Sequence, residues 1–215
     1  MKVAILGSGV VGETLANGFL LHGHAVMRGS REPDKLAAWK QGAKGDASTG
    51  TFEDAAQWCE LAVLCLRGSA AETVVDALGA ALAGKVVLDT TNPIAEGTTP
   101  KNGVIQYFTQ QNESLMERLQ KAAPKARFVK CWSSVGSVLM VNPKLPATPT
   151  MFICGNDAGA KATTTEILTQ FGWEALDCGA VESAGPIEAL CQLWCIPGMI
   201  RNDWTHAFKM LWPAP

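Results

Sequence analysis

The sequence predicts an α/β fold in which a doubly wound, mostly parallel sheet has helices on both faces. Short apolar segments alternate with longer helical patterns over the first 130 residues, and this alternation is typical of parallel sheets. The segment 61–66 is apolar almost without interruption, as expected of a strand that is buried on both faces. A glycine-rich turn joins the first strand directly to the first helix.

Two kinds of pattern predict the elements of the first 142 residues. Short apolar or β-branched runs predict strands, and they occur at 2–6, 25–28, 61–66, 85–89 and 126–131. A further short strand is expected at 44–48. Apolar residues three to four positions apart predict helices, and they occur at 10–21, 32–41, 52–58, 70–82 and 112–122. Pro33 supports the second helix, because proline is favoured in the first helical turn. A loop with two prolines and two glycines is expected at 90–103.

Three prolines within 141–150 mark the best internal boundary. We therefore predict a domain at 1–142 and a smaller C-terminal α/β extension at 143–215. The extension has too few strands for a core of its own, so we expect it to pack on the first domain and form one wall of a cleft. Its expected elements are strands at 150–154 and 173–177, a helix at 157–171, and a terminal helix at 182–211 that is interrupted near Pro197.

The composition excludes several classes of protein. The 215 residues are 47% hydrophobic with a formal charge of −2, which fits neither a disordered chain nor a nucleic-acid-binding protein. No apolar run approaches the ~20 residues of a membrane helix, and the short apolar start is not a signal peptide. Seven cysteines without a Cys-x-x-Cys pair are expected to be free thiols in a reducing, cytoplasmic protein. His22 and His24 have no further ligand nearby, so we expect no metal.

Gly7, Gly9 and Gly12 form a G-x-G-x-x-G sequence between the first strand and the first helix. This context predicts a Rossmann-type dinucleotide-binding turn. The first glycine permits the tight turn, the second lets a pyrophosphate approach the backbone, and the third lets the helix lie close to the strand. The helix N-terminus favours the phosphates through its free N–H groups and its dipole.

The residues after the second strand indicate which dinucleotide binds. An NAD-preferring site usually carries a carboxylate there, whereas this chain has Ser30 and Arg31, with Lys35 one helical turn further. A carboxylate would repel a 2′-phosphate, and a guanidinium with a hydroxyl would bind it. Glu32 opposes this interpretation, but we expect it to face solvent at a helix start, where negative charge is favoured. The sequence therefore predicts NADP(H) as the cofactor.

The glycine turn, Leu-His-Gly-His at 21–24 and Gly-Ser-Arg at 29–31 together resemble the NADP oxidoreductases that depend on coenzyme F420, a deazaflavin. They are also similar to the soluble oxidoreductase domain of the six-transmembrane metalloreductases. The likeness continues at 45–48, 53–56 and 153–157 and covers essentially the whole chain.

The resemblance implies a homodimer and a set of cofactor-binding residues. It implies that the pyrophosphate is held by Ser8, Gly9, Val10 and Val11, and the 2′-phosphate by Ser30, Arg31 and Lys35. It also implies that Leu66 and Arg67 line the path toward the nicotinamide. The low charged fraction of 18% suits a subunit interface, since soluble proteins usually have about 25%.

Two further segments follow predicted strands at the carboxyl edge of the sheet, where ligands collect. Asn92 could hydrogen-bond the nicotinamide carboxamide, or it could merely cap the turn before Pro93. Trp132, Ser133 and Ser134 could form an acceptor pocket with a flat apolar surface and hydroxyl donors. Packing of Trp132 in the core is the alternative.

No acid–base pair stands out, and the only tyrosine, Tyr107, is followed by Gln111 rather than by the lysine of a Tyr-x-x-x-Lys dyad. Hydride transfer between two rings needs mainly their correct placement. We therefore predict an NADP(H)-dependent oxidoreductase whose acceptor is F420 or a flavin-like ring. One alternative is an NADPH-dependent reductase of a small ketone, imine or hydroxy acid, which would need a proton donor such as Lys130, Lys144 or His206. The other is a non-catalytic sensor of NADPH and NADP+.

Overall fold

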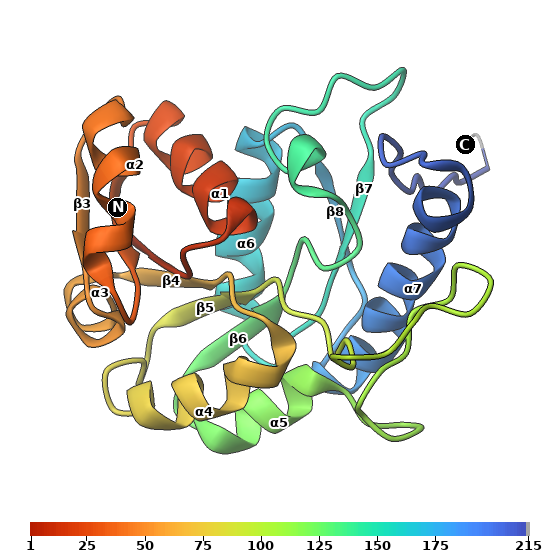
Figure 1. The fold of residues 1–215 in the computed structure, drawn as a ribbon, viewed down its shortest axis with the longest axis horizontal. Helices are drawn as coiled ribbons and strands as arrows, with labels where there is room; N and C mark the ends of the chain where they lie inside the picture. The colour runs from red at the N-terminus through yellow and green to blue at the C-terminus, as the bar shows by residue number, and fades with distance from the viewer. Residues whose placement is uncertain (214–215) are drawn as a thin grey trace.

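The computed structural model describes residues 1–213. Six strands form one parallel sheet in the order β3-β2-β1-β4-β5-β6 (Figure 1). The order reverses between β1 and β4, and ligands of such sheets bind outside the carboxyl ends of the strands at this point. The predicted doubly wound α/β fold is therefore confirmed. The strands are β1 (Lys2–Leu6), β2 (Ala25–Gly29), β3 (Ala47–Gly50), β4 (Leu61–Leu64), β5 (Val86–Asp89) and β6 (Arg127–Lys130).

Each face of the sheet has its own hydrophobic cluster, because neighbouring strand residues point to opposite faces. Val3 and Ile5 face one cluster, and Ala4 and Leu6 face the other. The helices that cover the first face are α1 (Val10–Leu21), α2 (Ala37–Gly42) and α6 (Ala158–Gln170). Those that cover the second face are α3 (Phe52–Trp58), α4 (Gly68–Leu78) and α5 (Leu115–Ala122).

The C-terminal segment packs on the first 142 residues. Its strands β7 (Thr150–Ile153) and β8 (Glu174–Asp177) form a parallel pair, and an antiparallel bridge between Lys130 and Cys154 connects this pair to β6. The segment contributes α6 to the first hydrophobic cluster, and the first turns of α7 (Ala184–Arg201) join the second. In Figure 1, α7 stands apart from the sheet beyond β7 and β8.

The terminal helix is shorter than expected, so the predicted extent of 182–211 is wrong. Helix α7 continues through Pro197 without a break and ends at Arg201, where Asn202 adopts a left-handed φ of 56°. The chain then reverses, and Trp204 packs so closely on Gly198 that a Cβ there would lie 2.3 Å from its ring. The tail reaches β7, where the Thr150 N–H donates to the Phe208 carbonyl.

Other boundaries also differ from expectation. The helix expected at 32–41 is a 3₁₀ turn at Pro33–Leu36 followed by the short α2, and the strand expected at 44–48 lies at Ala47–Gly50. Helix α5 begins at Leu115 because Ser114 and Glu117 form a capping box. No helix within residues 1–213 combines the length and apolar character that a membrane crossing requires.

Candidate active site

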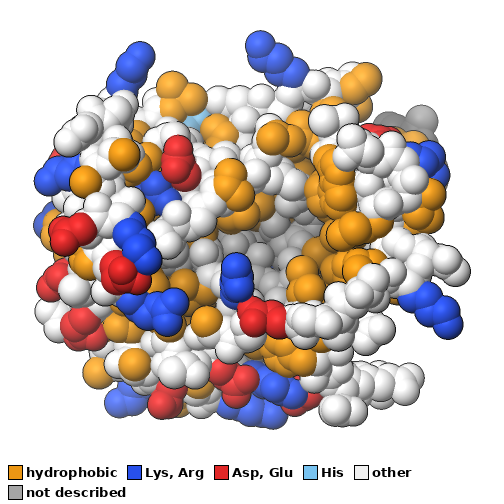
Figure 2. Space-filling model, viewed as in Figure 1, with side chains coloured by type: hydrophobic (Ala, Val, Ile, Leu, Met, Phe, Trp, Pro, Cys, Tyr) orange, Lys and Arg blue, Asp and Glu red, His pale blue; other side chains and the backbone are white. Residues whose placement is uncertain are grey.

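A hollow lies at the carboxyl edge of the sheet and is visible at the centre of Figure 2, with hydrophobic side chains on the side where Figure 1 places α7. Its floor is a cavity of about 460 Å³ next to the glycine turn. The residues around it come from the ends of β1, β4 and β5 and the loops that follow. They are Gly9, Val10, Val11, Cys65, Leu66, Arg67, Gly68, Thr90, Thr91, Asn92, Ile94 and Glu96.

The three glycines of the turn differ in what surrounds them. At Gly7, φ is +149° and a Cβ would lie 2.1 Å from the Cys65 carbonyl oxygen, so no larger residue fits. A Cβ on Gly12 would lie 2.7 Å from the Gly7 carbonyl oxygen, which shows how closely the helix approaches the strand. Gly9 has no protein atom within 4 Å of such a Cβ. The open space at Gly9 is where the sequence predicts the pyrophosphate.

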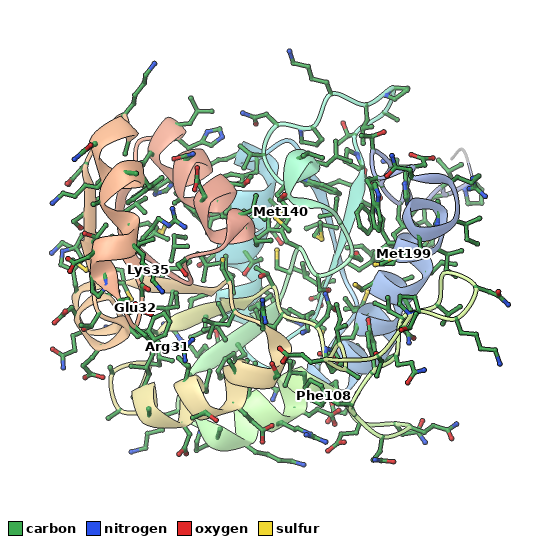
Figure 3. The ribbon with its side chains drawn as sticks, in the orientation of Figure 1. Arg31, Glu32, Lys35, Phe108, Met140 and Met199 are labelled. Atoms are coloured by element: carbon green, nitrogen blue, oxygen red, sulfur yellow. The ribbon has the colours of Figure 1, made fainter. Side chains whose placement is uncertain are left out.

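Ser30 and Arg31 line a second cavity of about 340 Å³ between the end of β2, the start of α3 and α4. Lys35 instead forms an ion pair with Glu32 over 2.8 Å, and both side chains are largely exposed. The hydrogen bond from Lys35 lowers the pKa of Glu32. Figure 3 shows Arg31, Glu32 and Lys35 together beyond β2, with Arg31 on the side of α4. Glu32 thus faces solvent as expected, but its ion pair also holds the Lys35 ammonium group at the exposed surface.

The residues predicted near the nicotinamide meet around the larger cavity. Gly68 lets the loop after β5 approach α4, since a Cβ there would lie 2.0 Å from the Asn92 carbonyl oxygen. The Asn92 Nδ2 donates to the Ser133 carbonyl over 2.7 Å, and its Oδ1 is buried without a hydrogen-bond partner among the described residues. Arg67, 85% exposed, extends along the rim to Glu96, 3.7 Å away. The Asn92 Oδ1 is therefore a buried acceptor without a partner among the described residues, and it belongs to a residue that lines the cavity.

The predicted acceptor pocket of Trp132, Ser133 and Ser134 is wrong, because all three side chains are buried. Trp132 is 1% exposed and packs with Phe19 and Phe171 at ring-centroid distances of 6.5 and 5.4 Å. Its φ of 57° is left-handed. Ser133 and Ser134 are 3% and 4% exposed. The alternative of core packing holds for Trp132.

A buried ion network lies directly behind the cavity and was not predicted from the sequence. The Lys130 Nζ lies 2.6 Å from Asp89 Oδ2 and 2.8 Å from Glu188 Oε1, and it donates to the Thr91 carbonyl over 2.9 Å. Burial alone would lower the pKa of Lys130, but the two carboxylates raise it above its ordinary value. The network therefore holds the backbone of the Thr90–Asn92 wall in place.

The Glu188 carboxylate has a second task at the start of α5. It accepts the N–H groups of Leu115 and Met116 over 3.0 and 3.1 Å, and its own backbone carbonyl accepts the Tyr107 hydroxyl. A pattern could have revealed half of the network, since Asp89 and Lys130 are cross-strand neighbours of opposite charge at the ends of β5 and β6. The position of Glu188 depends on where α7 packs.

The described residues around the larger cavity include no histidine, tyrosine or lysine. Burial raises the pKa of Cys65 to about 12, so its thiol stays neutral. Lys130 is fully buried in its ion network, and His206 stacks on Trp194 in the tail rather than on a helix over the cleft. Neither Lys130 nor His206, two of the predicted proton donors, is thus placed in this cavity.

Comparisons with known proteins find the same families that the sequence motifs resemble. Residues 2–93 match a family described as NADP oxidoreductase, coenzyme F420-dependent. The chain is 28% identical over 204 residues to the F420-dependent NADP reductase of Methanocaldococcus jannaschii, with 90% of each protein covered. It is also 28% identical over 204 residues to the metalloreductase STEAP3 of Rattus norvegicus, covering 93% of this chain but 39% of that protein.

A solved structure extends the likeness to the whole fold. A candidate F420-dependent NADP-reductase from Arthrobacter sp. FB24 superposes with a TM-score of 0.90 at 28% identity, over 98% of this chain and 99% of that one. These matches confirm the resemblance that the sequence predicted. The chain is thus similar, in sequence and in fold, to the coenzyme F420-dependent NADP oxidoreductases.

Proposed function

We propose that this protein transfers hydride between NADP(H) and a tricyclic acceptor, a deazaflavin such as F420 or a flavin. The observation that carries the proposal is the larger cavity, which adjoins the glycine turn and has no histidine, tyrosine or lysine among the described residues that line it. Hydride transfer from one ring to another depends on the correct placement of the two rings and on the exclusion of water more than on proton transfer. The name of the Methanocaldococcus relative supports the same acceptor class.

The larger cavity at the glycine turn and the second cavity at the end of β2 suggest how the coenzyme would lie. The 2′-phosphate of the adenosine ribose would meet Ser30 and Arg31, and Lys35 would reach it by leaving Glu32. The pyrophosphate would cross at Gly9, and the nicotinamide would enter the larger cavity, where the Asn92 Oδ1 can accept the carboxamide N–H. When bound, the reduced coenzyme supplies the hydride, and the protein residues bind and orient it.

An acceptor assay tests this function. Purified protein with NADPH is mixed separately with F420, FMN, FAD and a panel of ketones, imines and 2-oxo acids, and nicotinamide absorbance is followed. We expect oxidation of NADPH with the tricyclic acceptors only. Turnover with carbonyl or imine substrates alone would favour the small-molecule reductase, and tight NADPH binding without any turnover would favour the sensor.

We also propose that two copies of the chain associate through α7. Leu193 and Ile200, seven positions apart on α7, form a short apolar stripe on one side of the helix and are 54% and 56% exposed. A stripe of this kind on a helix is typical of a surface that packs against a partner. The partner that suits the resemblance to a dimeric family is a second copy.

Light scattering after size-exclusion chromatography tests the dimer. We expect twice the mass of one chain for the wild type and a single-chain mass for Leu193→Glu combined with Ile200→Glu. Ala162→Glu, which adds a charge to the exposed side of α6, is the control and should leave the dimer intact. A wild-type protein of single-chain mass at micromolar concentration would contradict the proposal.

A further inference from the structure

Arg28 is a buried cation with unusually little compensation. Its side chain is 1% exposed, yet its nearest carboxylate, on Glu13, lies 3.5 Å from Nη1 and is 55% exposed. Nη2 donates to the Gly9 carbonyl over a long 3.3 Å, and Nε has no partner among the described residues. Burial lowers the pKa of Arg28, and Glu13 only partly opposes this. A cation in such a site is costly unless another negative charge arrives.

The surroundings hold the Arg28 guanidinium in one place. It stacks over Trp39 at 4.9 Å from the ring centroid, and the Trp39 Nε1 donates to Asn17 of α1 over 2.8 Å. The guanidinium is therefore fixed between this ring and the back of the glycine turn.

The same place already has a positive potential. The N-terminus of α1 begins at Gly9, and a helix start carries roughly half a positive charge. The dipole and the guanidinium thus converge on Gly9, the glycine of the turn whose outer side is open. Two positive sources at an open backbone turn favour an anion in front of it.

We propose that Arg28 attracts the pyrophosphate of the coenzyme through space from behind the glycine turn, and that Glu13 moderates this attraction. The proposal rests on the NADP(H) site of the proposed function. It differs from the role of Arg31, which lies in the exposed cavity beyond β2 and would act on the 2′-phosphate alone. NADPH and NADH share the pyrophosphate, so Arg28 would affect both and leave the preference between them unchanged.

Two substitutions of opposite sign test the charge effect by equilibrium titration without any acceptor. Arg28→Met keeps a long side chain on Trp39 and removes the charge. Because the attraction between the guanidinium and the pyrophosphate is lost, we expect the Kd of NADPH and of NADH to rise about tenfold each. Glu13→Gln removes the competing carboxylate, and we expect both Kd values to fall about threefold. Arg28→Lys keeps the charge and should retain most of the affinity.

Further measurements separate this effect from a structural one. Arg127→Met removes the same charge at the far edge of the sheet, where Arg127 is 43% exposed, and should leave both Kd values unchanged. ADP-ribose, which contains the pyrophosphate but no nicotinamide, should lose affinity with Arg28→Met as NADPH does. The ligand-free Arg28→Met protein should melt no lower than the wild type, because it loses a poorly compensated buried charge.

Three results would overturn the proposal. They are unchanged coenzyme affinity in Arg28→Met, weaker binding in Glu13→Gln, or a loss of affinity in Arg28→Met that is confined to NADPH. Failure of the acceptor assay would leave these titrations interpretable, because they need only coenzyme binding. If neither the wild type nor any of the variants bound a dinucleotide, the proposed function itself would be wrong.

Discussion

Replacing Lys130 by methionine is expected to lower the free energy of unfolding by about 3–5 kcal/mol. The substitution leaves the Asp89 and Glu188 carboxylates buried with no cation between them. Both also lose a hydrogen bond that they cannot regain from water, and the Thr91 carbonyl loses its donor. Urea denaturation followed by tryptophan fluorescence or circular dichroism measures the change.

The control for Lys130→Met is Lys161→Met. Lys161 forms an ion pair with Asp177 over 2.8 Å, but that carboxylate is 50% exposed, so water can replace the lost lysine. We therefore expect a much smaller change in the urea midpoint for Lys161→Met. Equal midpoints for Lys130→Met and the wild type would mean that the buried network adds nothing to stability.

Replacing Arg31 by alanine is expected to weaken NADPH binding about ten- to a hundredfold and to change NADH binding little. A charge-assisted hydrogen bond is worth about 1.5–3 kcal/mol, and only NADPH has the 2′-phosphate that would accept it. Isothermal titration with each coenzyme gives the two affinities.

Arg31→Lys serves as the matched variant, because it keeps the charge but not the planar, two-pronged geometry of the guanidinium. We expect it to lose less NADPH affinity than Arg31→Ala. If Arg31→Ala weakened both coenzymes equally, Arg31 would contact a part that they share, and the preference for NADP(H) would have to come from Ser30 or Lys35.

Local patterns predicted the first half of the fold well. The strand at 2–6 and the helices at 10–21 and 52–58 have the predicted bounds, because buried apolar runs and helical spacing act within a few residues. The glycine turn could likewise be predicted from a short stretch of sequence. Its steric requirements at Gly7 and Gly12 arise from the adjoining strand and helix.

The errors arise where contacts between distant segments decide the structure. The terminal helix ends early because Trp204 packs on Gly198, a contact that no spacing rule describes. Trp132 follows a strand at the ligand-binding edge, but its left-handed backbone turns it toward Phe19 and Phe171. The sequence could show which segments reach the carboxyl edge of the sheet. It could not show the direction in which each side chain of those segments points.

The single carboxylate of Glu188 connects parts of the chain that are far apart in sequence. It binds Lys130 at the end of β6 and caps the first N–H groups of α5. The coenzyme-binding half is consequently not an interchangeable module. A chimera that joined it to the C-terminal half of another protein would need an acidic group at this same point. Without one, Lys130 would keep only Asp89 as a carboxylate partner, and the Leu115 and Met116 N–H groups would lose their acceptor.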